Sequence, residues 1–294
     1  MNGIKVMAHK PQFVEVEMDF SKQKYYEFLL SSDHHWDNPK CDRELLKNHM
    51  DEAKRRGAGI LLNGDTFCLM QGKGDPRGSK SDIRPEHNNA YYIDSIIDTA
   101  LDWYKDYVSH LISIGYGNHE SQLLKHKETD VLKRFVDLLN RTHGTNINLG
   151  GYATFIIFKG FISQNGSKKP RSLRMYKYHG SGGGGVVTKG VIATNRMAAS
   201  VDADIYWTGH IHESWIHNDV NISPDLNQKK IVERAVTHIC TSTYKREWKA
   251  KGSWHTERGA PMKPIGSMWL KIFADTVNGS PVMRYEVTPC LNSY

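Results

Sequence analysis

Residues 25–35, YYEFLLSSDHH, are an apolar run that ends abruptly in acidic and imidazole side chains. Four later stretches have the same form: GILLNGD (59–65), LISIGYGNHE (111–120), LRMYKYHG (173–180) and ADIYWTGHIH (203–212). Such runs indicate buried strands, and open α/β sheets bind ligands beyond the carboxyl ends of their strands. The candidate ligand residues at these ends are Asp33, His35, Asp65, Asn118, His179, His210 and His212.

The chemistry of these side chains predicts a site for divalent metal ions. Carboxylate oxygen, amide oxygen and imidazole nitrogen together suit manganese, which we favour, and also iron, zinc or nickel. Alternate residues of an extended segment point the same way, so Asp33 and His35 can reach one ion. Seven ligands are too many for one catalytic ion with an open position. They suffice for two divalent metal ions that share a carboxylate.

Strands alternate with helices in the first half of the chain, and strands dominate the second half. Helices are expected at residues 43–56, near 89–109, after a cap at Thr129, and near 186–199. For the first helix, Asp42 is the expected N-cap and Gly57 the expected stop. Because the candidate ligands come from both halves, we expect one α/β domain over residues 1–294. Its two packed mixed β-sheets would be flanked by helices in an α/β/β/α sandwich. Residues 27–215 carry all the metal motifs, and residues 216–294 are expected to complete the second sheet.

The composition is that of a globular protein, with 39% hydrophobic and 24% charged residues among 294. No run approaches the ~18–20 apolar residues that a membrane span needs, and the N-terminus lacks the apolar core of a signal peptide. We therefore expect a cytoplasmic protein with no membrane partner. The cysteines Cys41, Cys68, Cys240 and Cys290 are scattered, which predicts free thiols and argues against a zinc knuckle or a disulfide framework.

The formal net charge of +7 favours an anionic partner such as a nucleic acid, a nucleotide or another phosphoester substrate. Two stretches concentrate the basic residues, 159–177 and 245–263, and the second also contains Trp248 and Trp254. Basic residues interleaved with aromatic ones are typical of a groove for single-stranded nucleic acid, and a solvated loop is the alternative. The sequence does not predict the oligomeric state.

The motifs, taken in chain order, resemble those of the calcineurin-like metallophosphoesterase superfamily. They are Asp33-x-His35, Gly64-Asp65, Gly117-Asn118-His119-Glu120, His179 and Gly209-His210-x-His212. All five blocks are present, each after a strand-like run, and the resemblance covers about residues 27–215. The loop at 66–87 and the HGSGGGG stretch at 179–185 are similar to those of uncharacterised phage-encoded members.

The resemblance implies a role for each of these residues. One ion would be held by Asp33, His35, Asp65 and His212, and the other by Asp65, Asn118, His179 and His210, with Asp65 bridging them. His119 would be the catalytic residue that faces the scissile phosphate and stabilises charge or protonates the leaving oxygen. The implied reaction is phosphoester hydrolysis, in which a hydroxide bridging the two ions attacks in line. The group that orients His119 is not identified; Glu120 and Asp75 are candidates.

One departure from the family bears on the substrate. Family protein phosphatases carry Asp-Arg-Gly shortly after Gly-Asp, whereas Asp65 here is followed by Thr66-Phe67-Cys68-Leu69. With the positive charge, this favours a phosphodiesterase acting on nucleotides or nucleic acid. A phosphomonoesterase for phosphoproteins or small molecules is the nearest alternative, and a non-catalytic nucleic-acid-binding protein with a structural metal site is another. Arg77 and Arg84, in the loop after Asp65, are the expected substrate contacts.

The glycine run Gly180-Ser181-Gly182-Gly183-Gly184-Gly185 formally matches the GxGxxG motif of dinucleotide sites, with Asp202 and Asp204 near the spacing of a ribose-binding acid. A run of glycines matches this motif trivially, however, and both aspartates precede the next strand instead of ending it. We expect a loop that lets the backbone approach the metal site or a phosphate.

Overall fold

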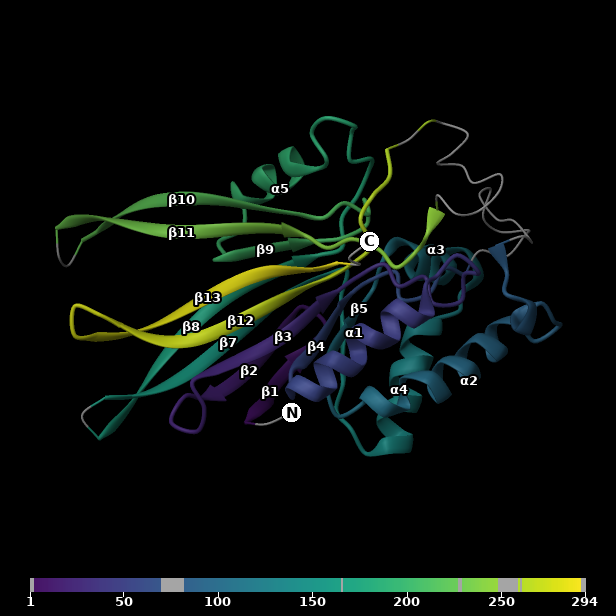
Figure 1. Cartoon of the computed structure of the whole chain (residues 1–294), viewed down its shortest axis with the longest axis horizontal. Helices are drawn as coiled ribbons and strands as arrows, with labels where there is room; N and C mark the ends of the chain where they lie inside the picture. Colours follow the sequence, from purple (N-terminus) through teal and green to yellow (C-terminus); the bar gives the residue numbers. More distant parts are fainter. Residues whose placement is uncertain are drawn as a thin grey trace.

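The computed structural model describes residues 3–69, 82–164, 166–226, 229–247, 259 and 261–291. Within these ranges, two mixed β-sheets pack face to face, and helices lie on both outer sides of the pair (Figure 1). The predicted α/β/β/α sandwich is therefore confirmed.

The six-stranded sheet has the order β13–β12–β3–β4–β5–β6. Its parallel strands are β3 (Tyr25–Ser31), β4 (Gly59–Asn63), β5 (Leu111–Gly115) and β6 (Asn148–Gly150), and an antiparallel hairpin of β12 (Gly266–Val277) and β13 (Ser280–Leu291) extends it beside β3. On its outer face pack the helices α1 (Arg43–Arg56), α2 (Tyr92–Tyr104) and α4 (Val131–His143), with α3 (Asn118–Lys127) against α4. Two short 3₁₀ segments, η3 (Pro85–His87) and η4 (Lys105–Tyr107), flank α2.

The seven-stranded sheet has the order β1–β2–β7–β8–β9–β11–β10. Its strands are β1 (Ile4–Lys10), β2 (Phe13–Asp19), β7 (Ala153–Gln164), β8 (Ser167–Tyr178), β9 (Ile205–Thr208), β10 (Trp215–Asp225) and β11 (Lys230–Cys240). The parallel pairs are β2–β7, β8–β9 and β9–β11, and the others are antiparallel. The helix α5 (Val191–Ala198) covers part of its outer face.

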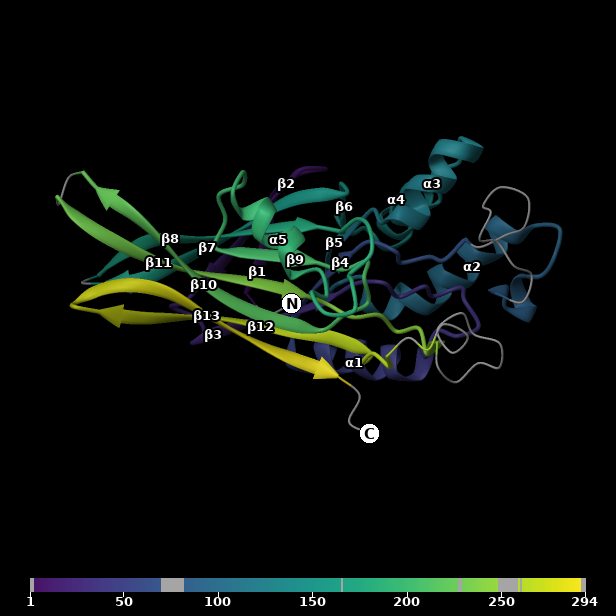
Figure 2. The same cartoon turned by 90° about the horizontal axis from the view of Figure 1, so that it is seen from above.

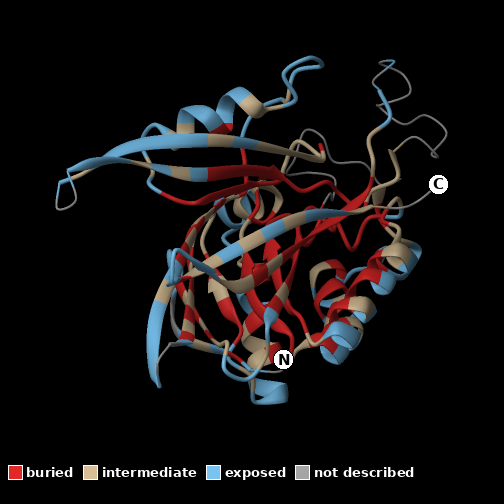
Figure 3. Ribbon diagram, turned by 60° about the vertical axis from the view of Figure 1, so that its left-hand side comes forward, coloured by how far each residue is buried: buried red, intermediate tan, exposed pale blue. Residues whose placement is uncertain are grey.

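The alternation of side chains along each strand builds two main cores. In β3, Phe28 and Leu30 enter the core between the sheets, whereas Leu29 enters the core under the helices. A third, small cluster around Tyr206 and Met197 lies beneath α5. Figure 3 shows buried residues concentrated between the layers, with exposed residues on the outer helix faces and the hairpin tips.

Local signals in the sequence account for where the helices begin and end. Asp42 caps α1 by accepting a hydrogen bond from Leu45 N at 2.9 Å, and Gly57 ends it in a left-handed conformation, as predicted. The predicted cap at Thr129 is wrong. Asp130 caps α4 through Lys133 N, while the Thr129 hydroxyl donates back to Lys127 O.

Several elements were not predicted from the sequence: β1, β6, β10 and α3. Also, residues 216–294 do not complete one sheet only, because β10 and β11 join the seven-stranded sheet while β12 and β13 join the six-stranded one. The edge strand β10 was missed because most of it is exposed and therefore lacks an apolar run.

Three hairpins, β7–β8, β10–β11 and β12–β13, project from the sandwich on the side away from α1, α2 and α4 (Figures 1 and 2). All four cysteines have free thiols. In the described part of the chain, none of the helices combines the length and the apolar character needed to cross a membrane.

Candidate metal centre

Five strands bring the candidate ligands to one end of the sandwich. The parallel strands β3, β4 and β5 end just before Asp33, Asp65 and Asn118, and the parallel neighbours β8 and β9 end just before His179 and His210. Parallel strands share the direction of their carboxyl ends, so each sheet presents its candidates at one end. The side-chain amide of Asn63 joins the sheets there. It donates to Tyr178 O, at the end of β8, at 3.2 Å and to Trp207 O, within β9, at 3.4 Å.

Asp33, His35 and His212 form one group of candidate ligands, named here the Asp33 cluster. His212 Nε2 lies 3.3 Å from Asp33 Oδ1 and 3.2 Å from His35 Nε2. The three ligand atoms lie within 4.8 Å of one another. Asp33 and His35 are buried, whereas the His212 side chain is 19% exposed.

Asp65, Asn118, His179 and His210 form the second group, the Asp65 cluster. His179 Nε2 lies 3.3 Å from Asp65 Oδ2 and 3.2 Å from Asn118 Oδ1, and His210 Nδ1 lies 2.6 Å from the same Asn118 oxygen. One ligand atom each from Asp65, His179 and His210 fits within 4.8 Å. The structure thus brings all seven predicted ligand residues into two candidate metal-ligand clusters.

The inward-facing atoms of both clusters are chiefly acceptors. His179 Nδ1 donates to Asn63 O at 2.6 Å, so the Nε2 of the neutral ring presents its lone pair to Asp65 and Asn118. In the other cluster, Asp33 Oδ1 is buried and has no hydrogen-bond partner among the described residues. Converging acceptors repel one another unless a proton or a cation lies among them. Carboxylate, amide and imidazole donors arranged in this way fit divalent metal ions.

The electrostatics of the site favour bound positive charge. Burial opposes a charge on His179, but the Asp65 carboxylate outweighs it and raises the pKa of His179 to about 9. Burial also opposes the charge on Asp65, yet His179 and His119 hold the pKa of Asp65 well below its usual value. Burial lowers the pKa of His35 far below the usual value, which keeps this imidazole in the neutral, metal-ligating form.

No family model matches this chain, and no curated protein matches it. Among solved structures, it is similar to the structure of vacuolar protein sorting 29 from Cryptosporidium parvum. The two share 13% sequence identity with a TM-score of 0.35, over 90% of this chain and 99% of that chain. A fold does not determine function, which depends on the residues of the site.

His119 lies in the first turn of α3, beside the Asp65 cluster. Its Nδ1 donates to the carbonyl oxygen of Cys68 at 2.5 Å, which orients Nε2 to a position 3.8 Å from Asp65 Oδ2. The orienting group is therefore a backbone carbonyl, which leaves no signal in the sequence. Of the two side chains considered for this role, Asp75 lies outside the described residues, and Glu120 has a different task.

Glu120 holds the loop that carries Asp65. Its buried carboxylate accepts hydrogen bonds from Asp65 N at 3.2 Å, Phe67 N at 2.9 Å and Gly117 N at 2.9 Å. Burial, together with the charge of Asp65, raises the pKa of Glu120 to about 8. Glu120 therefore ties the loop after β4 to the start of α3 and fixes the separation of Asp65 and Asn118.

Backbone strain is concentrated at the candidate ligands. Five of the seven have positive φ angles: Asp33 (53°), His35 (44°), Asp65 (48°), His210 (68°) and His212 (57°). The prediction that Asp33 and His35 converge from an extended segment is therefore wrong; left-handed turns direct them. Each non-glycine residue in this region costs on the order of 1–3 kcal/mol, and such strain gathers at functional sites.

Glycines precede the ligands where a side chain would collide with a neighbouring ligand. A Cβ on Gly117 would lie 2.1 Å from Asp65 Oδ1, and one on Gly209 would lie 2.6 Å from Asp33 Oδ2. These close approaches explain the glycines of two motifs.

The glycine-rich stretch approaches a candidate ligand at its start. A Cβ on Gly180 would lie 2.7 Å from His210 Cβ, whereas one on Gly182 or Gly183 would meet nothing within 4 Å. Asp202 and Asp204, considered as ribose ligands, instead pair with Arg174. The approach to the metal site that was predicted for this loop is thus seen at Gly180.

Two residues near the site were missed in the sequence. Cys68 forms a third group with His35 and His119, their ligand atoms within 4.8 Å of one another, although burial raises the pKa of its thiol. Lys245, with a side chain 14% exposed, pairs with Glu247 at 2.8 Å, and its charge contributes to the low pKa of His35. Lys245 lies beyond the last motif, so only the fold brings its charge near His35.

Neither predicted substrate contact is placed at the clusters. Arg77 lies outside the described residues. Arg84 donates to Asn38 O at 3.0 Å and Cys41 O at 2.9 Å, and so holds the segment between β3 and α1.

Several basic side chains in residues 159–177 form ion pairs or hydrogen bonds within the protein. Lys159 pairs with Glu17 at 3.3 Å and Lys168 with Asp19 at 2.7 Å. Lys177 is fully buried and donates to Gly151 O at 3.1 Å; burial lowers its pKa to about 7. In the second basic stretch, Trp248 and Trp254 lie outside the described residues.

Proposed function

We propose that this chain is a hydrolase of phosphoesters that depends on two divalent metal ions, manganese above iron, zinc or nickel. The observation that carries the proposal is the pair of adjoining acceptor clusters with the Nε2 of His119 beside them. Asp33, His35 and His212 would hold one ion, and Asn118, His179 and His210 the other. Asp65, whose Oδ2 lies near both His179 and His119, would bridge them.

Two ions bound there would supply activation of the attacking water and neutralisation of phosphate charge. The protein's own part is to position and to move a proton. Because Nδ1 of His119 is engaged by the Cys68 carbonyl, its Nε2 is the nitrogen that can donate a proton to the leaving oxygen. Asn118 and His119 occupy the first turn of α3, where the helix dipole favours an anionic phosphate.

We favour a phosphodiester substrate, of the nucleotide or nucleic-acid class. The net charge of +7 and the absence of Asp-Arg-Gly after Asp65 support this choice. A phosphomonoesterase is the nearest alternative, because the two clusters by themselves do not distinguish the esters. A non-catalytic nucleic-acid-binding protein would have no use for an oriented imidazole beside its metal site.

The test compares hydrolysis of bis-p-nitrophenyl phosphate and p-nitrophenyl phosphate with Mn²⁺, in the wild type and in Asp65→Asn and His119→Ala. Preferential cleavage of the diester, lost in both variants, is the expected result. Preferential cleavage of the monoester would replace the diester proposal with the phosphatase alternative. Metal binding without turnover of either ester, combined with tight and salt-sensitive binding of nucleic acid, would favour the non-catalytic protein.

A further inference from the structure

A pocket of about 410 Å³ opens next to His119 and lies between α2 and α3. One face of α3 lines it, since His119, Gln122, Leu123, His126 and Lys127 follow one another at the three- and four-residue spacing of a helix face. The start of α2 supplies the opposite wall with Tyr92 and Ile93. The volume is within the range of sites for small organic ligands.

The position of the pocket relates it to one part of a substrate. His119 belongs both to the pocket wall and to the edge of the Asp65 cluster, where its Nε2 lies 3.8 Å from Asp65 Oδ2. A leaving oxygen that takes a proton from Nε2 must lie next to this imidazole. The group attached to that oxygen then extends along the wall of which His119 is a part.

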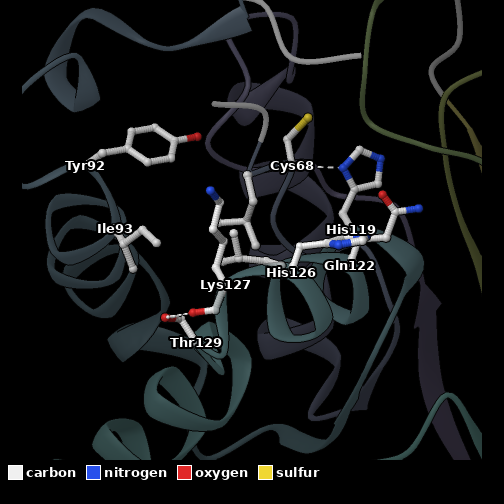
Figure 4. A pocket seen from close by; sticks show the side chains of 10 residues that line it. Cys68, Tyr92, Ile93, His119, Gln122, His126, Lys127 and Thr129 are labelled. Atoms are coloured by element: carbon white, nitrogen blue, oxygen red, sulfur yellow. Dashed lines mark hydrogen bonds between the residues drawn. The ribbon is translucent and has the colours of Figure 1, made fainter. Parts of the chain in front are cut away.

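The chemistry of the walls indicates what that group is. Ile93 from α2 and Leu123 from α3 offer aliphatic surface, and the largely buried Tyr92, 5% exposed, adds the accessible part of its aromatic ring, which together suit a base. Gln122 adds an amide, and the exposed Lys127 adds an ammonium group, which suits a phosphate. Figure 4 shows the side chains of Tyr92 and Lys127 directed into the pocket, with His119 at its side.

We propose that this pocket binds the leaving nucleotide of a linear phosphodiester, with Lys127 contacting the next phosphate of the strand. The inference rests on the proposed hydrolase function and narrows its substrate. Water adds to phosphorus, the P–O bond to the leaving nucleotide breaks, and the proton on His119 Nε2 passes to the leaving oxygen and is restored from water. A cyclic nucleotide keeps its leaving oxygen tethered and would leave the pocket without an occupant.

The first experiment measures KM of the manganese-loaded protein for three dinucleotides: TpT, pTpT and TpTp. One terminal phosphate lies on the leaving side of the scissile bond and the other on the retained side. We expect the phosphate on the leaving side to lower KM about tenfold, the effect of one charge-assisted contact. The phosphate on the retained side serves as the internal control.

Matched variants then locate the effect in the pocket. Lys127→Ala should abolish the tenfold preference, whereas Lys125→Ala, which removes the same charge from α3 outside the pocket, should retain it. Tyr92→Leu should raise KM for all three dinucleotides, whereas Tyr91→Leu, at an exposed neighbouring position, should not. If Tyr92→Leu does not fold, the comparison of Lys127→Ala with Lys125→Ala, both at exposed positions, still tests whether the pocket binds the phosphate.

The outcomes separate this inference from the function on which it rests. Turnover of bis-p-nitrophenyl phosphate without a preference among the dinucleotides, or a preference that survives Lys127→Ala, would overturn the pocket assignment alone. Faster cleavage of 3′,5′-cyclic thymidine monophosphate than of the dinucleotides would also overturn it. Absence of turnover of bis-p-nitrophenyl phosphate would remove the hydrolase proposal and this inference together.

Discussion

The Asp33 cluster and the Asp65 cluster differ in how firmly their side chains are held. In the Asp65 cluster, His179 is fully buried and bonded to Asn63 O, and Asn118 Oδ1 lies close to both imidazoles. In the Asp33 cluster, buried atoms of Asp33 and His35 lack hydrogen-bond partners among the described residues. Preorganised ligands lose less freedom when they bind, so the Asp65 cluster is expected to take the first and tighter ion.

The largest effect should come from the residue proposed to belong to both clusters. Asp65→Asn removes a buried negative charge that raises the pKa of His179 and that would be shared by two ions. We expect turnover to fall about a thousandfold or more, since loss of metal activation is worth several kcal/mol. Steady-state kinetics and the metal content of the purified variant measure this. Retention of two ions per chain in Asp65→Asn would show that Asp65 does not bridge.

His119→Ala should separate chemistry from metal binding. His119 is proposed to donate a proton and not to ligate, so kcat should fall about 10²- to 10⁴-fold while both ions stay bound. His143→Ala, an exposed histidine at the end of α4, is the matched control and should leave kcat unchanged. A loss of metal along with activity in His119→Ala would instead place His119 among the ligands, in the group that it forms with His35 and Cys68.

The positions of the candidate ligands could be predicted because buried strands leave a clear record. β3, β4, β5 and β9 are short apolar runs, β8 ends in the alternating stretch LRMYKY, and the chemistry lies in the residues that follow each of them. Gly117 and Gly209 added a second signal, because a side chain at either position would collide with a ligand carboxylate. The lateral order of the strands and the packing of the two sheets then assemble the clusters.

Other features depend on tertiary contacts that leave no local pattern. The positive φ angles of Asp33 and His35 are imposed by tertiary hydrogen bonds of the backbone. Asp33 N donates to Gly64 O and His35 N donates to Asp65 O, each at 3.0 Å. The helix α3 begins on the motif residue Asn118 and has a weak apolar stripe, so no helix was predicted there. The pocket beside His119 was missed for the same reason. Arg84 was predicted to contact the substrate, and Lys177 belongs to the basic stretch 159–177, but both donate hydrogen bonds to backbone carbonyls of the protein.

Removing one histidine from each cluster tests the difference in affinity directly. His179→Asn should weaken the tighter ion, and His212→Asn the weaker one. Each substitution should lower the affinity for its ion at least about 100-fold. This is the upper end of the loss of metal affinity caused by removing a group that only supports a ligand. Calorimetric titration with Mn²⁺ of the two variants and the wild type measures both affinities. If His212→Asn eliminates the tighter ion, the proposed order of filling is wrong.

The smallest effect should come from groups that support the ligands without touching the ions. Glu120→Gln replaces one of the two acceptor oxygens that bind the N–H groups of Asp65, Phe67 and Gly117, so at least one of these donors loses its partner. We expect about a tenfold loss in affinity for the tighter ion, the lower end of the effect of such supporting groups.

Thr243→Val is the matched change at the Asp33 cluster, because the Thr243 hydroxyl donates to Asp33 O at 2.7 Å. Tyr244 N also donates to Asp33 O, at 3.2 Å, so the loss of the hydroxyl is partly compensated. We therefore expect the affinity for the weaker ion to fall severalfold and the affinity for the tighter ion to stay unchanged, as measured in the same Mn²⁺ titration. Equal losses of affinity at both ions in either variant would mean that the clusters bind as one unit, coupled through their shared carboxylate and through the hydrogen bonds that join them, His210 N to Asp33 Oδ2 and His35 N to Asp65 O.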